Sequence, residues 1–199
     1  AVELLYHLGL TQAAVLGTSR GGLIAMGLAY AAKPRLLGVA LNDVGPEIAD
    51  AGLEVIKNYL GKPPAFDTLE QVAAYRKAHM TGFNLPDSRW LEEAARLFAV
   101  TDDGLALTYD PKLRDAVLGH GAQPAPDLWP FFDALEGVPL CMVRGANSDL
   151  LAADTFAEMR RRRPDAVATE VPDRGHIPFL DEADSLTALN RWLDGMRGG

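Results

Sequence analysis

The sequence contains one cysteine, no long apolar run, and fewer basic than acidic side chains. Cys141 alone excludes an internal disulfide framework and a cysteine-rich metal site, and its apolar neighbours favour a buried small side chain over a reactive thiol. Lysine and arginine total 19 against 27 aspartates and glutamates, which gives a formal net charge of -8. The resulting long-range field repels polyanions, so we expect neither nucleic acid nor an anionic membrane surface as a partner.

Apolar stretches are also too short for a membrane span, which needs about 18 residues or more. No basic segment precedes an apolar one, so no signal peptide is visible, and we expect a cytoplasmic location. The chain begins at Ala1, and residues 1–10 are typical of the later turns of an amphipathic helix. With 199 residues, of which 48 % are hydrophobic, the chain is long and apolar enough to bury a substantial core.

Short apolar runs alternate with longer helical segments, which is typical of an α/β fold. The expected strands cover residues 13–17, 36–41, 139–143 and 166–171. The expected helices between and after them cover residues 23–32, 153–162 and 183–196. The first strand is apolar throughout rather than alternating, as in a strand covered on both faces. The pattern therefore predicts a mostly parallel sheet with flanking helices.

The middle of the chain has a different character. Residues 47–135 form amphipathic helical stretches broken by proline and glycine, among them a helix from Trp90 to Val100 and one strand-like piece at 105–108. We therefore expect a core in two parts, residues 1–46 and 136–199, separated by a mainly helical insertion at 47–135.

The most informative motif is a G-x-S-x-G sequence, Gly17-Thr18-Ser19-Arg20-Gly21, placed between an expected strand and an expected helix. A serine at such a sharp turn has a strained backbone and an exposed hydroxyl, and the glycines allow neighbouring backbones to come close. The free N–H groups at the start of the following helix can stabilise an oxyanion. This setting predicts a nucleophilic serine.

Serine is a weak nucleophile near neutral pH and needs a base, and the base needs an orienting acid. Of the four histidines, His176 alone follows an expected strand, at the carboxyl edge where open sheets place ligands. His7 lies in a helical segment, and His79 and His120 lie in the insertion, where packed or solvated side chains are the default. We therefore predict His176 as the base.

Two aspartates compete for the role of the acid. Asp149 follows the strand at 139–143 and gives the chain order Ser, Asp, His. Asp43 follows the strand at 36–41 and leaves the same edge of the sheet. We favour Asp149 and interpret Asp43 as a hinge residue between the sheet and the insertion.

These motifs together resemble the α/β-hydrolase superfamily. The run from Ala14 to Gly22 resembles its nucleophile elbow, and the segments 144–151 and 175–182 resemble its acid and histidine loops. Residues 47–135 resemble the helical cap that many members insert. The resemblance implies the C-terminal half of a mostly parallel sheet with flanking helices.

By this resemblance, Ser19 would be the nucleophile, His176 the base and Asp149 the orienting acid, with Asp43 as the alternative acid. The backbone N–H of Arg20 would be one oxyanion donor. A serine at the elbow suits acyl transfer, so the resemblance implies hydrolysis of an ester, thioester or lactone. Carbon–carbon bond hydrolysis, perhydrolysis and a non-catalytic ligand-binding role on the same fold stay open, as does the oligomeric state.

The implied substrate is a small acyl compound. No spacing such as H-E-x-x-H indicates a metal site, and no cofactor motif is present, so we predict neither a metal nor a cofactor. Aromatic side chains of the insertion are either an acyl pocket or simply core, and these are Trp90, Phe98, Trp129, Phe131 and Phe132.

The sequence departs from the family pattern at its start. Relatives have strands and a loop before the elbow, and that loop donates the second oxyanion N–H. Typical element lengths make this difference roughly 60–90 residues. We therefore expect an N-terminally truncated chain that, as given, is aggregation-prone and nearly inactive, because loss of one oxyanion donor typically costs ~10²–10³ in turnover.

Overall fold

The chain divides into two compact units in the computed structural model, which describes residues 1–63, 65–118 and 126–197. The first unit comprises Ala1–Gly52 and Pro126–Gly199, and the second comprises Leu53–Ala125.

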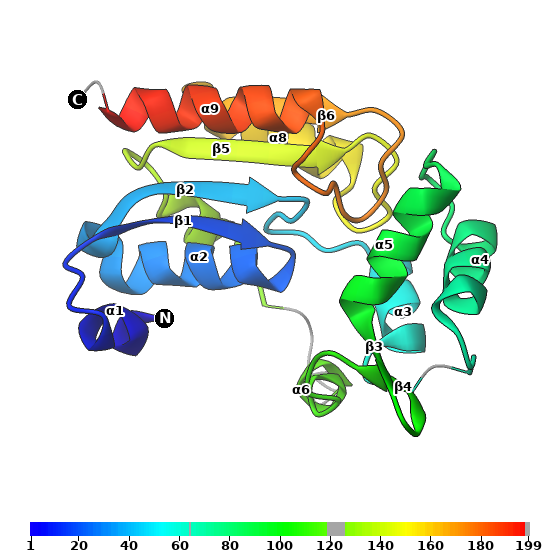
Figure 1. Cartoon of the computed structure of the whole chain (residues 1–199). Coiled ribbons are helices and arrows are strands. Elements are labelled where there is room, and N and C mark those ends of the chain that lie inside the picture. The colour runs from blue at the N-terminus through cyan, green and yellow to red at the C-terminus, as the bar shows by residue number, and fades with distance from the viewer. Residues whose placement is uncertain (64, 119–125, 198–199) are drawn as a thin grey trace. The chain divides into compact units, whose positions relative to one another are not determined.

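A four-stranded parallel sheet is the centre of the first unit (Figure 1). Its strands are β1 (Ala13–Thr18), β2 (Leu36–Asn42), β5 (Leu140–Gly145) and β6 (Val167–Val171). They lie in the order β1-β2-β5-β6, and every neighbouring pair is parallel. The predicted mostly parallel sheet is therefore confirmed.

Helices cover both faces of this sheet. The helical elements of the first unit are α1 (Val2–His7), α2 (Arg20–Ala32), a short 3₁₀ turn η1 (Lys33–Arg35), α7 (Trp129–Asp133), α8 (Ala153–Arg162) and α9 (Ala183–Arg197). Helix α2 packs on β1 and β2, while α9 packs on β6, β5 and β2 from the opposite face (Figure 1). A further helix, α3 (Asp50–Tyr59), begins in the first unit and continues into the second.

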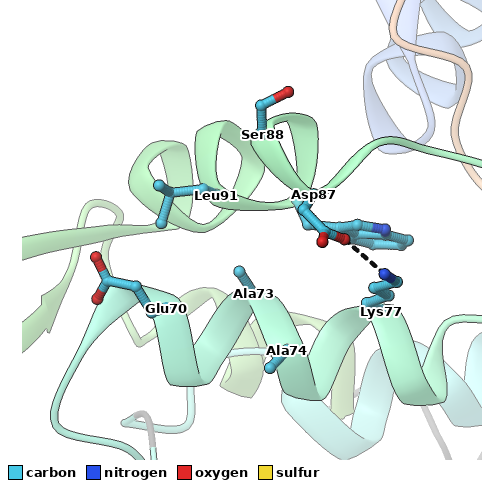
Figure 2. A pocket seen from close by; sticks show the side chains of 8 residues that line it. Glu70, Ala73, Ala74, Lys77, Asp87, Ser88 and Leu91 are labelled. Atoms are coloured by element: carbon cyan, nitrogen blue, oxygen red, sulfur yellow. Dashed lines mark hydrogen bonds and ion pairs between the residues drawn. The ribbon is translucent and has the colours of Figure 1, made fainter.

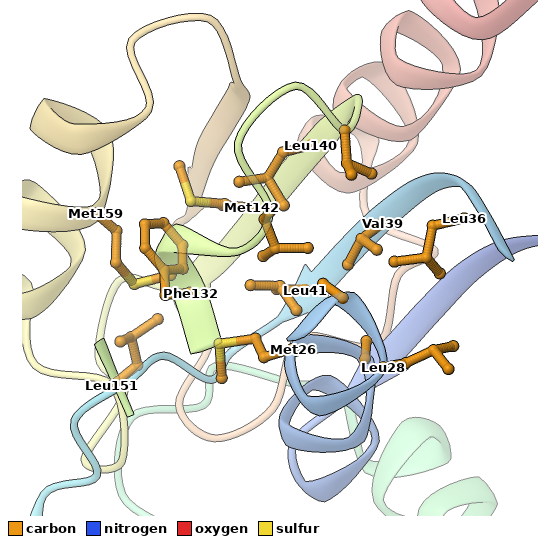
Figure 3. Close-up of a cluster of buried hydrophobic side chains, with 14 of the residues drawn as sticks. Met26, Leu28, Leu36, Val39, Leu41, Phe132, Leu140, Met142, Leu151 and Met159 are labelled. Atoms are coloured by element: carbon orange, nitrogen blue, oxygen red, sulfur yellow. The ribbon is translucent and has the colours of Figure 1, made fainter. Parts of the chain in front are cut away.

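Alternate side chains of the central strands enter two separate hydrophobic cores, as the period of two along a strand requires. Leu41 and Met142 join Met26 and Phe132 in the larger core (Figure 3). The smaller core, beneath α9, is formed by Ala40, Cys141, Val143, Val171, Ala188 and Trp192. The continuous apolar runs of β2 and β5 are thus explained by burial on both faces.

Cys141 is one of these core side chains. It is completely buried, and burial raises the pKa of its thiol to about 12. The prediction of a buried, packed cysteine is therefore confirmed.

Strand β1 differs from the prediction that both of its faces are covered. It stands at one end of the strand order, and Ala14 and Leu16 are exposed, Leu16 to 46 %. Val15 points the other way and packs against the larger core. An apolar run alone therefore did not distinguish a strand buried on one face from one buried on both.

The second unit is helical with one β-hairpin. Its remaining elements are α4 (Leu69–His79), α5 (Asp87–Leu97), β3 (Phe98–Thr101), β4 (Gly104–Leu107) and α6 (Leu113–Leu118). Strands β3 and β4 pair antiparallel. The prediction that the helix continues to Val100 is therefore wrong, because residues 98–100 belong to β3. The chain turns at Gly104, where φ is +108°, and β4 folds back along β3.

The second unit spans residues 53–125, a shorter segment than the insertion expected at 47–135. Phe132 and Leu135 are fully buried in the larger core of the first unit, which explains why the chain around them belongs to that unit. The interpretation of the middle segment as a cap stays a prediction.

Candidate active site

Ser19 lies in a sharp turn between β1, which ends at Thr18, and α2, which begins at Arg20. Its backbone has φ 50° and ψ -120°, a strained conformation for a residue with a side chain. A Cβ on Gly17 would lie 2.5 Å from the backbone of Gly21, so this position admits only glycine. The expected strand–serine–helix geometry is present.

His176 follows β6 and reaches back to the serine. Its Nε2 lies 3.0 Å from the Oγ of Ser19, which is hydrogen-bonding distance. The imidazole side chain is only 10 % exposed. The structure brings together the serine and the histidine that the sequence predicts.

Asp43 completes the arrangement on the other side of the imidazole. Its Oδ2 lies 2.7 Å from Nδ1 of His176, and its side chain is completely buried. Two further donors contact the same carboxylate. The backbone N–H of Gly145 donates to Oδ1 at 2.8 Å, and the hydroxyl of Ser148 donates to Oδ2 at 2.7 Å. The three hydrogen-bonding partners satisfy both oxygens of this buried carboxylate.

The sheet register explains the position of Asp43. Thr18 and Asn42, the last residues of β1 and β2, are partners in the parallel ladder. Ser19 and Asp43 each follow directly after one of these two adjacent strands. The backbone N–H of Ser19 donates to the carbonyl of Asn42 at 3.0 Å and extends this pairing. Asp43 then turns out of the strand with φ 55°. The strand order therefore places the serine and the acid side by side.

The structure corrects the prediction that Asp149 contacts His176. Asp149 is exposed and lies beyond the turn that follows Gly145, and its backbone carbonyl accepts a hydrogen bond from Gly52. Asp43 occupies the place next to His176 instead, so it is not merely a hinge residue. Its position immediately after a strand made Asp43 the alternative acid, and the pairing of that strand with β1 decides in its favour.

The proton positions follow from the partners of each atom. An ionised Asp43 can only accept, so Nδ1 of His176 carries its proton. Nε2 is then the unprotonated nitrogen, and it faces the hydroxyl of Ser19. This tautomer can take the hydroxyl proton as the oxygen attacks. The N–H of Arg20 is the first of α2 and has no acceptor within the helix. It can therefore donate a hydrogen bond to an oxygen that develops negative charge.

Glu182 stabilises the loop that carries His176. Its carboxylate accepts hydrogen bonds from the backbone N–H groups of Phe179 and Leu180, each at 2.9 Å. Burial by itself would raise the pKa of Glu182, but hydrogen bonds from the backbone N–H groups of Phe179 and Glu182 and from the side chains of Ser185 and Arg174 lower the pKa below its ordinary value. Glu182 is therefore held ionised in the folded chain.

Neither His7 nor His79 takes part in this arrangement. His7 is the last residue of α1, and Nδ1 of His79 lies 2.8 Å from the carbonyl of Tyr75 within α4. His120 lies outside the described residues.

The aromatic side chains considered for an acyl pocket belong to hydrophobic clusters. In the first unit, Phe132 is fully buried, and Trp129 and Phe131 pack against the same core. In the second unit, Trp90 is 3 % exposed, and Phe98 packs beside it. Core packing therefore accounts for all five.

A pocket of about 440 Å³ lies within the second unit, between α4 and α5 (Figure 2). Lys77 and Asp87 form an ion pair of 2.5 Å at its wall, and Ser88 lines it as well. Among residues 1–63, 65–118 and 126–197, no group of three or more His, Cys, Asp or Glu side chains is arranged to hold a metal ion. The absence of a metal or cofactor stays a prediction.

A parallel sheet with a serine turn, a histidine loop and a buried acid at one edge defines the α/β hydrolase class of proteins. The family model of the alpha/beta hydrolase family matches residues 1–189, and the chain therefore belongs to this family.

Similar proteins include a 3-hydroxybutyrate-oligomer hydrolase from Cupriavidus necator, which is 40 % identical over 193 residues. That alignment covers 92 % of this chain, and the chain spans 65 % of the length of that relative. A crystal structure of an alpha/beta hydrolase from Novosphingobium aromaticivorans superposes with a TM-score of 0.85 at 37 % identity, covering 96 % of this chain and 68 % of that one. The fold of E-2-(acetamidomethylene)succinate hydrolase is also similar, with a TM-score of 0.76, 22 % identity and coverages of 97 % and 70 %.

Within the part of the chain that the structure describes, none of the helices is both long and apolar enough to cross a membrane.

Proposed function

We propose that the protein is a serine hydrolase that cleaves a carboxylic ester, thioester or lactone through an acyl-enzyme. The observation that carries this proposal is the continuous hydrogen-bonded series Ser19–His176–Asp43, with distances of 3.0 and 2.7 Å. Family membership and the strained serine turn support it.

The series supports the following reaction. The Oγ of Ser19 attacks the acyl carbon while Nε2 of His176 takes the hydroxyl proton, and the N–H of Arg20 donates to the oxyanion. The imidazolium returns the proton to the leaving alcohol or thiol as the bond to it breaks. Water then attacks the acyl-serine, its proton passes through His176 to Ser19, and the carboxylic acid is released. Asp43 stabilises the imidazolium in both halves.

The substrate class is an extension of this proposal from the relatives. The Cupriavidus necator protein is named for oligomers of 3-hydroxybutyrate, which are joined by ester bonds. At 40 % identity, short esters of hydroxy acids are the first compounds to test.

The proposal is tested with the purified whole protein, a series of p-nitrophenyl esters of increasing acyl length, and 3-hydroxybutyrate oligomers. Ser19→Ala and His176→Ala are each expected to lower kcat by a factor on the order of 10⁴ or more, because either change disables the nucleophile and base together. Ser88→Ala, at the pocket of the second unit, is the control and should retain activity. Undiminished ester hydrolysis by Ser19→Ala would overturn the proposal, and a folded protein that cleaves none of these esters would favour a ligand-binding role.

A further inference from the structure

Ser148 contacts the acid of the proposed triad through its hydroxyl. Its Oγ lies 2.7 Å from Oδ2 of Asp43, the same oxygen that faces His176. The backbone N–H groups of Leu151 and Leu150 also donate to this Oγ, at 3.0 and 3.3 Å.

These contacts fix the direction of the hydroxyl proton. A serine hydroxyl has one proton to donate and two lone pairs to accept with. The two backbone N–H groups occupy both lone pairs, so the single proton is directed at Asp43. A hydroxyl without these two partners could rotate away, whereas this one is a permanent donor to the carboxylate.

We infer that Ser148 is a positioning residue that, together with the N–H of Gly145, holds the carboxylate of Asp43 in the orientation that His176 requires. This inference rests on the proposed function. Gly145 N–H binds Oδ1 and Ser148 binds Oδ2, so each carboxylate oxygen has its own donor. Rotation about the Cβ–Cγ bond would break both contacts. The end of β5 therefore fixes the acid that follows β2.

A structural role in the loop is the competing explanation, because the same hydroxyl accepts from Leu150 and Leu151. Two variants separate the roles. Ser148→Ala removes the hydroxyl, whereas Ser148→Thr keeps it. Thr155→Val is a matched control, since Thr155 is a buried hydroxyl that donates at 2.9 Å to Glu47, a carboxylate outside the triad.

The first readout is the second-order rate at which a fluorophosphonate modifies Ser19 in the whole protein. Ser148→Ala should slow it about tenfold, or ~1.4 kcal/mol of barrier, and Ser148→Thr should restore at least half of the rate. In an Asp43→Asn background, Ser148→Ala should have less than a twofold effect, because Ser148 acts through that carboxylate. An equal tenfold loss in both backgrounds would contradict the inference.

The second readout is the low-field proton NMR resonance of Nδ1–H of His176, which needs no substrate. It should change position in Ser148→Ala, return in Ser148→Thr and stay unchanged in Thr155→Val. A resonance that is absent from the parent protein, or that does not move in Ser148→Ala, would overturn the role of Ser148. If the resonance changes in the variants as expected but Ser19 of the parent protein does not react with the fluorophosphonate, the proposed function alone is overturned.

Discussion

At the scale of single residues, Asp43 and Asp149 give a matched test of the proposed acid. Asp43 is fully buried against His176, whereas Asp149 is exposed. Asp43→Asn keeps the size of the side chain and the tolerance for positive φ but cannot hold the same imidazole tautomer, so kcat should fall by about 10⁴. Asp149→Asn should change kcat by less than about threefold. Steady-state hydrolysis of the best ester compares the two, and a reversed order would return the role to Asp149.

The sequence identified two members of this arrangement and gave the third, Asp43, only as the alternative to Asp149. Ser19 is marked by its glycine motif and His176 by its position after a strand, and both signals are local. The acid depends on strand order, because β2 lies between β1 and β5 and brings Asp43 beside both loops. Local sequence patterns do not contain that order.

At the scale of elements, the two outer glycines of the serine turn are predicted to differ. A Cβ at Gly17 would meet backbone atoms at 2.5 Å, whereas one at Gly21 meets nothing within 4 Å beyond its neighbours in α2. Gly17→Ala should therefore lower the free energy of unfolding by ~1–3 kcal/mol or more. Gly21→Ala lies in α2 and should be neutral or stabilising by up to ~1 kcal/mol. Urea unfolding measures both, and equal losses would mean that the backbone approach at Gly17 does not control the turn.

Regular elements were predictable where one periodicity extends through them. Helix α8 has the bounds expected, residues 153–162, because its apolar and charged positions alternate at helical spacing. Of the β3–β4 hairpin, the sequence predicts only the second strand. Residues 98–100 continue the preceding helical pattern, and their partner strand begins only a few residues later. Pairing across a turn decided the structure there.

At the scale of the whole molecule, ionised carboxylates should make stability fall in acid. The pKa of Asp165 is lowered by hydrogen bonds from Arg163, and that of Glu182 by its several donors although burial opposes them. A group with a lower pKa in the folded than in the unfolded state contributes stability above its unfolded pKa and loses it as pH falls. The free energy of unfolding should therefore decrease from about pH 5 downward.

Glu182→Gln tests this pH dependence. It should cost ~1.5–3 kcal/mol at pH 7, where the parent carboxylate is charged and hydrogen-bonded, and much less at pH 3. Glu54→Gln removes one side of an exposed pair with Lys57 and is the control, with an expected change near zero. Denaturant unfolding at both pH values makes the comparison. A cost for Glu182→Gln that does not depend on pH would exclude the carboxylate charge as its cause.

The division of the chain was predictable only in outline. A change of pattern after the second strand marked the middle segment, but its edges depend on which side chains enter the larger core. Phe132 and Leu135 do so, and nothing in their local sequence distinguishes them from residues of the insertion.

The central claim is that Ser19, activated by His176 and Asp43, is the nucleophile. It is tested most directly by treating the whole protein with a fluorophosphonate and mapping the modified peptide. One equivalent of label on Ser19, lost in His176→Ala and strongly slowed in Asp43→Asn but not in Asp149→Asn, is the predicted result. A folded protein that takes up no label, or takes it up at another residue, would contradict the account.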